Sequence, residues 1–341
     1  MLELLKNLCM HNAPSGMEKV LRDTILSEIS GYCDVKVDPS GNIIAFKKGR
    51  KRALKRVMID AHMDEVGIII TSVTDDGFLR FDTVGGILPE SLMCKRVIIN
   101  NRIGVIGAKP IHQSTEQERK VIPKINSMYV DIGAQSAEEA LQYAAPGDIG
   151  TFYGGFLKMG SSAVLSKALD DRFGCAALIE LLKQESEYDF YATFTVGEEL
   201  GCRGAKTAAF SVDPHYAIIL EATTASDIHD TPEDKQVCRV KGGAVISFMD
   251  HSTLYEQSLY KTAFEIAAQN KIKAQTKSVV AGGNNAGAVS LSRNGVKTIA
   301  LSLPCRYIHS SASVAAIDDM RQILKLADAM KDYFASLNNN D

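Results

Sequence analysis

The sequence contains no tryptophan, no Cys-x-x-Cys pair and no long apolar run, and each absence argues against a class of protein. Without tryptophan, it lacks the large aromatic side chain that sugar-binding sites commonly use as a platform. No stretch approaches the ~18 uninterrupted apolar residues that a membrane-spanning helix needs. The first residues include Glu3 and no apolar segment of the kind found in a secretory signal. We therefore expect neither a membrane partner nor export.

Charge and cysteine are also limited. The formal net charge of −3 gives no reason to expect nucleic acid or an anionic membrane as a partner. The seven cysteines are an odd number and are scattered along the chain. Such usage is typical of reduced thiols, so we expect a cytoplasmic protein.

The length of 341 residues favours two domains, and the texture of the sequence indicates where they divide. Helical and apolar strand-like segments alternate in residues 1–67 and again in 163–341. Between them, residues 68–162 carry short β-rich runs separated by turn signals, one helical segment at 136–144 and a polar loop at 110–124. We predict an α/β domain made of the two outer ranges, with a β-rich domain inserted at 68–162.

Local patterns place several elements within this frame. Ser15 and Glu18 match an S-x-x-E capping box ahead of a helix ending near residue 29. The segment 34–49 alternates apolar and polar residues around Pro39-Ser40-Gly41, which indicates a hairpin. Apolar strands are expected at 56–60, 191–196, 216–220 and 297–303, and helices at 174–184, 252–270 and 318–337.

Acidic residues and histidines follow these four apolar strands. His62 and Asp64 follow the first strand, Glu198 and Glu199 the second, Glu221 the third and His309 the fourth; Asp170 and Asp171 precede the helix at 174–184. The carboxyl ends of strands in an open α/β sheet are where ligands bind. We therefore expect these side chains to meet at one edge of the sheet.

Each of these residues has an ordinary explanation when taken alone. An aspartate before a helix is most often an N-cap, a pair of glutamates is most often solvated, and a lone histidine is most often hydrogen-bonded in the core or at the surface. Together, however, several carboxylates at one buried edge would repel and desolvate one another unless a cation lay between them. The combination therefore favours one or two metal ions.

The residue types restrict the metal and its chemistry. Imidazole and carboxylate without thiolate suit zinc, cobalt or manganese better than calcium or magnesium. Two such ions sharing a carboxylate would lie ~3.5–4 Å apart and would acidify a water molecule between them. Because neighbouring side chains diverge, one of Glu198 and Glu199 can bind metal while the other takes the proton of that water. Asp64, two residues from His62, can hold the far nitrogen of its ring.

Four motifs carry a resemblance to a known family: "AHMDEVG" at 61–67, "KALDDRFG" at 167–174, "GEELGCRGA" at 197–205 and "RYIHS" at 306–310. In order and spacing the chain resembles the dinuclear metallo-aminopeptidases that build tetrahedral dodecamers, some of which carry an old cellulase M or endoglucanase label. The resemblance covers nearly the whole chain. It implies a zinc-peptidase-like α/β/α sandwich as the catalytic domain, and an inserted β domain that drives dimerisation and assembly to a dodecamer.

The resemblance also implies roles, which we carry over residue by residue. It makes His62 a ligand of the first metal, Asp170 the bridge, Glu199 and His309 ligands of the second metal, Glu198 the general base and Asp64 the residue that orients His62. The last ligand of the first metal is usually an aspartate, and here that position is Glu221, with Asp227 as a fallback. Two departures concern substrate preference more than metal binding: Asn284-Asn285 stands where the family often has Thr-Asp, and "SSASVAA" follows His309.

The leading hypothesis is therefore removal of the N-terminal residue from short peptides by two divalent ions, Zn²⁺ or Co²⁺ with Mn²⁺ as a further candidate, in a homo-oligomer. A related metal-dependent deacylase is the alternative within the same class. A glycoside hydrolase is the alternative from another class, although its paired carboxylates need neither metal nor histidine. A catalytically silent assembly protein is a third possibility, against which the complete set of ligands argues.

Overall fold

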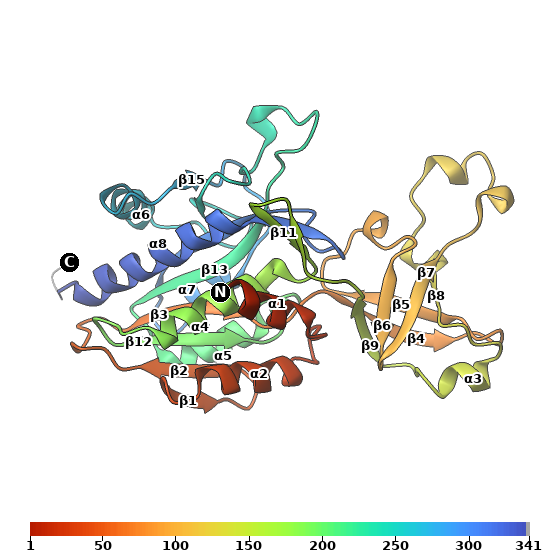
Figure 1. Cartoon of the computed structure of the whole chain (residues 1–341), viewed down its shortest axis with the longest axis horizontal. Coiled ribbons are helices and arrows are strands. Elements are labelled where there is room, and N and C mark those ends of the chain that lie inside the picture. Colours follow the sequence, from red (N-terminus) through yellow and green to blue (C-terminus); the bar gives the residue numbers. More distant parts are fainter. Residues whose placement is uncertain (339–341) are drawn as a thin grey trace.

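The computed structural model describes residues 1–338 and contains two sheets that mark two structural units (Figure 1). The larger sheet has eleven strands, and the smaller one is a closed six-stranded barrel at one end of the molecule. The predicted α/β fold with an inserted β-rich unit is confirmed. Within the described residues, no helix combines the length and apolar character needed to cross a bilayer.

The large sheet is mixed, with its parallel strands in the middle. Its order is β1-β2-β12-β3-β13-β16-β17-β11-β10, and β14 joins β15 to β16. The strands are β1 Asp34–Val37, β2 Ile43–Lys47, β3 Val57–His62, β10 Leu157–Met159, β11 Ala163–Ser166, β12 Phe190–Thr195, β13 Tyr216–Thr224, β14 Ala244–Ile246, β15 Ala274–Thr276, β16 Lys297–Arg306 and β17 Ser313–Ala316. The neighbours β12, β3, β13 and β16 are parallel, so their carboxyl ends share one edge.

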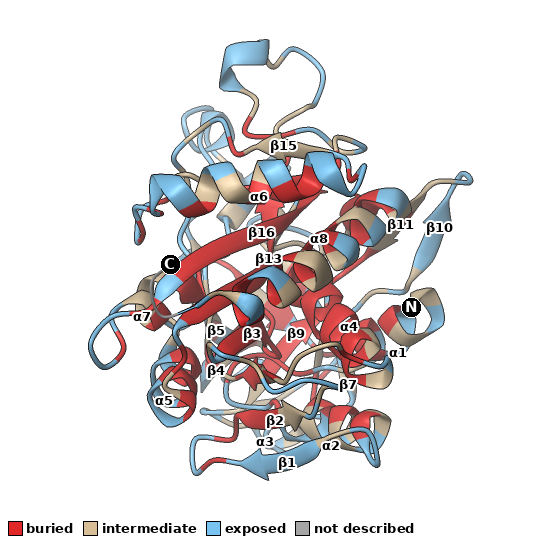
Figure 2. Ribbon diagram, turned by 90° about the vertical axis from the view of Figure 1, so that its left-hand side faces the viewer, coloured by how far each residue is buried: buried red, intermediate tan, exposed pale blue. Residues whose placement is uncertain are grey.

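Helices cover both faces of this sheet. They are α1 Leu2–Met10, α2 Lys19–Ile29, α4 Leu169–Lys183, α5 Arg203–Val212, α6 Gln257–Gln269, α7 Asn285–Ser290 and α8 Ile317–Ser336. α4 and α8 contact each other and the middle strands, while α5 and α7 form a second contacting pair on the other side (Figure 2). Because both faces are covered, the middle strands are almost wholly buried, which explains their continuous apolar runs.

The barrel is antiparallel throughout and has its own core. Its strands are β4 Gly67–Val73, β5 Leu79–Val84, β6 Arg96–Ile99, β7 Arg102–Gly107, β8 Tyr129–Asp131 and β9 Ile149–Phe152. The short helix α3, Ala137–Leu141, lies beside it, and the predicted loop at 110–124 contains two 3-10 turns. The barrel strands thus occupy 67–152, whereas β10 pairs with β11 in the large sheet although it lies inside the predicted range 68–162.

A buried ion cluster links the two places where the chain passes between the large sheet and the barrel. Glu65 lies just before β4, and its carboxylate pairs with Lys167 at 2.6 Å and with Arg172 at 3.2 Å. Thr151, in the last barrel strand, donates a hydrogen bond to the same carboxylate at 3.1 Å. Burial opposes the charge, but the two cations hold the pKa of Glu65 below its usual value. A buried charge persists when it is paired and hydrogen-bonded in this way.

The predicted capping box at Ser15 and Glu18 is wrong. α2 begins at Lys19, and no side chain caps its first turn. The hydroxyl of Ser15 instead donates to Asp64 at 2.6 Å, and the carboxylate of Glu18 accepts from the backbone nitrogen of Gly197 at 3.1 Å. Both residues therefore support loops at the carboxyl ends of β3 and β12, a tertiary role that overrides the local motif.

Candidate metal centre

The predicted site residues gather at the carboxyl edge of the parallel strands. His62 is the last residue of β3, Glu221 lies within β13, and His309 follows the end of β16. Glu198 and Glu199 follow β12, and Asp170 lies at the start of α4, where its backbone dihedral angles are not helical. The sheet order β12-β3-β13-β16 makes these strand ends neighbours, as the alternation of helices and strands predicted.

His62 presents one ring nitrogen to a cluster of carboxylates. Its Nδ1 lies 3.0 Å from the backbone oxygen of Asp64, which can only accept, so Nδ1 carries the proton. The other nitrogen, Nε2, lies 3.2 Å from Asp170 Oδ1 and 3.5 Å from Glu221 Oε1, and it carries the lone pair when the ring is neutral. This tautomer is the one in which Nε2 binds a metal ion.

His309 has the same arrangement on the other side. Its Nδ1 lies 2.7 Å from the backbone oxygen of Gly86 and therefore also carries the proton. Its Nε2 faces Asp170 Oδ2 at 3.2 Å and Glu199 Oε1 at 3.3 Å. Gly86 lies in the loop after barrel strand β5, so the barrel orients one of the two histidines.

Asp170 lies between the two histidines and offers one oxygen to each. The possible ligand atoms form two groups, and inside each group they lie within 4.8 Å of one another. One group is His62, Asp171 and Glu221, and the other is Asp170, Glu199 and His309. The oxygens of Asp171 already accept from the backbone nitrogens of His62 at 3.3 Å and Gly174 at 2.9 Å. The geometry therefore favours Asp170 as the shared carboxylate and gives Asp171 a supporting position, a distinction that the Asp-Asp pair alone did not reveal.

The charges in this cluster are strongly perturbed. Burial raises the pKa of Glu199 to about 8, against the opposing charge of His309. Burial alone would lower the pKa of His309, but Asp170 and Glu199 raise it to about 9. Burial and the charge of Asp170 raise the pKa of Glu221 well above its usual value. Such crowding is what a cation between the carboxylates relieves, so the donor set fits divalent metal ions.

Glu198 is placed differently from its neighbour Glu199. Both glutamates line a cavity of about 280 Å³, but Glu198 belongs to neither group of ligand atoms. The thiol of Cys202 donates a hydrogen bond to Oε1 of Glu198 at 3.4 Å. Burial raises the pKa of Glu198. The two adjacent acids are thus separated in space, as a division between base and ligand requires.

Asp64 connects the parts of the site more extensively than the sequence suggested. Its Oδ1 lies 3.4 Å from Nδ1 of His62 and accepts from the backbone nitrogen of Glu198 at 3.0 Å. Its Oδ2 accepts from the backbone nitrogen of Glu199 at 3.1 Å and from the hydroxyl of Ser15 at 2.6 Å. Asp64 therefore fixes both the first histidine and the loop that carries the two glutamates.

The remaining predicted residues lie in other surroundings. Asp227, the fallback ligand, pairs with Arg306 at 2.8 Å, so the strand end contributes Glu221 instead. Asn285 donates to Asp60 at 2.8 Å and to Thr195 at 2.9 Å beneath the site. Asn284 caps α7 by accepting from the backbone nitrogen of Ala286. Asn284 therefore lines the cavity beside the site, while Asn285 is hydrogen-bonded to the strands behind it.

Comparison with known proteins gives consistent matches over the whole chain. A family described as M42 glutamyl aminopeptidase matches residues 41–326. A putative aminopeptidase of Acetivibrio thermocellus is 38% identical over 96% of this chain and 97% of its own length, and a lysyl aminopeptidase of Pyrococcus furiosus is 34% identical over 96% of each. The TET1 peptidase of Pyrococcus horikoshii, described as assembling into a tetrahedron or an octahedral shell, is 35% identical with a TM-score of 0.85 over 97% of this chain and 98% of its own.

Proposed function

The chain belongs to the M42 glutamyl aminopeptidase family, and from that premise we propose how its own residues remove an N-terminal amino acid. The family expectation from the sequence is confirmed, as is an enzyme that hydrolyses peptides. The glycoside hydrolase alternative is wrong, because the relatives are peptidases. The observation that carries the proposal is Asp170, whose two oxygens lie 3.2 Å from Nε2 of His62 and from Nε2 of His309.

In this proposal His62, Asp170 and Glu221 hold one divalent ion, and Asp170, Glu199 and His309 hold a second. Two such ions supply polarisation of the scissile carbonyl and acidification of a water molecule. Glu198 accepts the proton of that water and donates it to the departing amine, which is general acid-base catalysis by one carboxylate. Asp64 keeps Glu198 in reach through the backbone hydrogen bond at 3.0 Å.

We propose Zn²⁺ or Co²⁺ as the metal, with Mn²⁺ as the further candidate. The support is the donor set of imidazole and carboxylate. The nearby thiols are engaged elsewhere: Cys175 donates to the backbone oxygen of His62 at 3.1 Å, and Cys202 contacts Glu198. A cytoplasmic location is likewise a proposal, supported by the seven cysteines, none of which forms a disulfide.

Cleavage should require a free α-amine on the substrate. We expect leucyl- and glutamyl-anilides to be hydrolysed and their N-acetylated forms to resist, because an exopeptidase site recognises the charged amine beside its metal ions. Release of the anilide chromophore measures both, with each acetylated compound as the matched control. Equal rates on free and acetylated substrates would instead support the deacylase alternative.

The outward face of the barrel supports a proposal of self-association. Ile103 and Val105 on β7 point outward and are 46% and 44% exposed, and Ile103 lies opposite Ile98 of β6 in the register. Exposed apolar side chains on neighbouring strands are groups that a contact with another chain would bury. We propose that the domain at 68–162 joins dimers that assemble to a dodecamer, as assembly is described for the TET1 relative.

We expect the intact chain to sediment as an oligomer and Ile103→Asp to yield a smaller species, because the substitution would bury a charge in the contact. Leu254→Asp is the matched control, since Leu254 is 78% exposed on the other unit. Analytical ultracentrifugation at micromolar concentration measures both. A wild-type monomer that is fully active, or equal effects of the two substitutions, would contradict this role of the barrel.

A further inference from the structure

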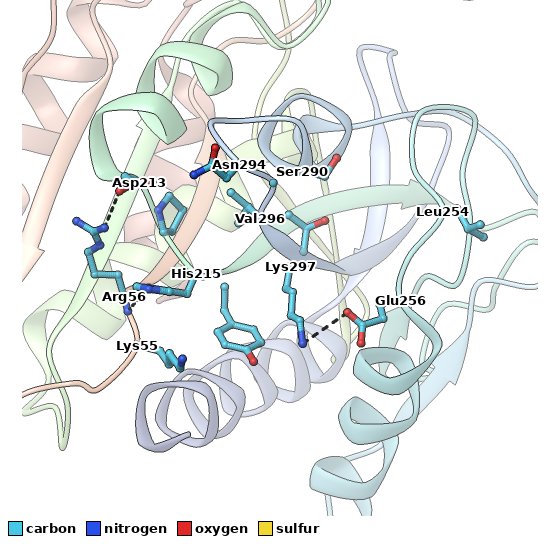
Figure 3. Close-up of a pocket in the computed structure, with 14 residues that line it drawn as sticks. Lys55, Arg56, Asp213, His215, Leu254, Glu256, Ser290, Asn294, Val296 and Lys297 are labelled. Carbon is cyan, nitrogen blue, oxygen red and sulfur yellow. Dashed lines mark hydrogen bonds and ion pairs between the residues drawn. The ribbon is translucent and has the colours of Figure 1, made fainter. Parts of the chain in front are cut away.

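Two cavities lie at the end of the large sheet opposite the proposed metal centre, where the middle parallel strands begin. The first, of about 780 Å³, is lined by Tyr216 and Lys297, which begin β13 and β16 (Figure 3). The second, of about 730 Å³, is lined by Val57, which begins β3. Arg56 and His215 line both cavities, so the two adjoin. Each has the volume of a small-molecule site, and the proposed hydrolysis uses neither.

The segment that links β2 to β3 brings a high density of positive charge to these cavities. Seven of the ten residues in "KKGRKRALKR" at 47–56 are lysine or arginine and none is acidic, in a chain whose net charge is −3. Part of this charge is neutralised by ion pairs. Lys51 pairs with Glu187 at 2.7 Å, and the guanidinium of Arg56 lies 2.7 Å from Asp213 in the first cavity (Figure 3).

Lys48 and Arg52 give the second cavity two cations without an acidic partner. Both are exposed and line this cavity, and within residues 1–338 no carboxylate lies within 4.0 Å of either. Asp189 lines the same cavity, but its Oδ1 accepts from a backbone nitrogen at 2.7 Å. Nδ1 of His215 accepts from the backbone nitrogen of Arg56 at 3.0 Å, so its Nε2 carries a proton and can donate. The polar part of the wall therefore suits an anion.

The other part of the wall of the second cavity is aromatic and aliphatic. Phe46 of β2 and Tyr191 of β12 are cross-strand partners, both half-buried, with ring centroids 5.0 Å apart. Leu54, which is 60% exposed, lines the same space. Aromatic bases stack on rings of this kind whatever their identity, and guanidinium and ammonium groups bind phosphate. An aromatic wall bordered by cations therefore matches a ligand with a flat ring and a phosphate group.

We propose that the second cavity binds a nucleotide, with the base against Phe46 and Tyr191 and the phosphate at Lys48 and Arg52. The shared donors of Arg56 and the room in the first cavity would accommodate a longer phosphate chain. This site is separate from the metal centre, because β3 begins at the cavity and six residues of strand span roughly 20 Å before the proposed ligands. The inference does not depend on the peptidase function.

The test is calorimetric titration of the intact, metal-loaded protein with adenosine, guanosine and uridine 5′-monophosphates at low salt. We expect saturable binding that neither adenosine nor inorganic phosphate reproduces at the same concentration, because each supplies half of the contacts. Arg52→Gln should weaken binding of the nucleotides by roughly 10-fold or more, the scale of one hydrogen-bonded contact with a charged group. Tyr191→Leu should weaken binding of the nucleotides and leave that of inorganic phosphate unchanged.

Two variants serve as controls. Arg50→Gln removes the same charge from the same segment, but Arg50 pairs with Glu185 and lines neither cavity, so nucleotide affinity should change by no more than a few-fold. Glu199→Gln is expected to lose metal and retain these cavities, so it should bind the nucleotides as the wild type does. Circular dichroism of each variant confirms that the fold is kept, and Arg52, in an exposed loop, is the substitution least able to disturb it.

Each contrary outcome is decisive. Absence of saturable binding of all three nucleotides would overturn the proposal. Loss of binding in Glu199→Gln would also overturn it, because the phosphate would then lie at the metal centre. Equal weakening by Arg50→Gln and Arg52→Gln would show only general attraction to a basic surface. Inorganic phosphate that binds as tightly as the nucleotides would show that the aromatic wall takes no part. None of these results bears on the proposed hydrolysis, which anilide release tests separately.

Discussion

Glu198→Gln should lower kcat by ~10²–10⁴-fold, or roughly 3–5 kcal/mol of barrier, while the enzyme keeps both metal ions. The amide has the shape of the carboxylate but cannot take the proton of the attacking water. Because Glu198 belongs to neither group of ligand atoms, its replacement should leave metal binding intact. Little change in KM would mark a role confined to the transition state. Steady-state kinetics together with elemental analysis of the purified protein measures these effects.

Glu199→Gln is the control built into the same dipeptide. Glu199 lies 3.3 Å from Nε2 of His309, within the second group of ligand atoms, so this variant should lose metal and activity together. If Glu198 were only a solvated neighbour, its substitution would cost within about ±0.5 kcal/mol. Near wild-type turnover in Glu198→Gln, or loss of metal from that variant as from Glu199→Gln, would contradict the division of roles.

Removal of metal should have an effect at least as large. We expect dialysis against a strong chelator to abolish hydrolysis, by roughly 10³-fold or more, because the several kcal/mol of charge stabilisation that the ions supply would be lost. Adding Zn²⁺, Co²⁺ or Mn²⁺ should restore it. Activity before and after, with metal content and circular dichroism on the same samples, separates loss of metal from loss of fold.

Asp64→Asn is a second test of the metal site. The substitution weakens the support of His62 without removing a proposed ligand, so metal affinity should fall by ~10–100-fold and excess metal should recover most activity. His62→Ala removes a ligand and should not recover in this way. Full hydrolysis by protein shown to be free of metal would eliminate the two-ion mechanism.

The position of the site could be predicted from the sequence because it depends on topology. Four apolar strands each followed by an acid or a histidine implied a shared edge, and the parallel order of β12, β3, β13 and β16 supplies one. The hairpin at 34–49 and the closing helix at 318–337 could be predicted for local reasons, since turn residues and helical periodicity are properties of short segments. β13 runs to Thr224, beyond its predicted end, so Glu221 lies inside a strand.

Contacts between distant segments could not be predicted. Ser15 and Glu18 match a local capping motif, but their side chains bind loops that lie about fifty and about one hundred and eighty residues away along the chain. The resemblance selected Asp170 over Asp171, but the physical ground for that choice appears only in the structure: the carboxylate of Asp171 already accepts from the backbone nitrogens of His62 and Gly174.

The hydrogen bond from His309 to the oxygen of Gly86 makes metal occupancy a shared property of both units. The barrel supplies the group that sets the tautomer of a proposed ligand, so the proposed second ion would bind most tightly when the barrel holds Gly86 in place. Linkage is reciprocal: an ion that gains affinity from this arrangement stabilises it by the same free energy. If a second chain fixes the barrel as we propose, assembly and metal loading would therefore reinforce each other, and the isolated chain would bind metal more weakly than the oligomer.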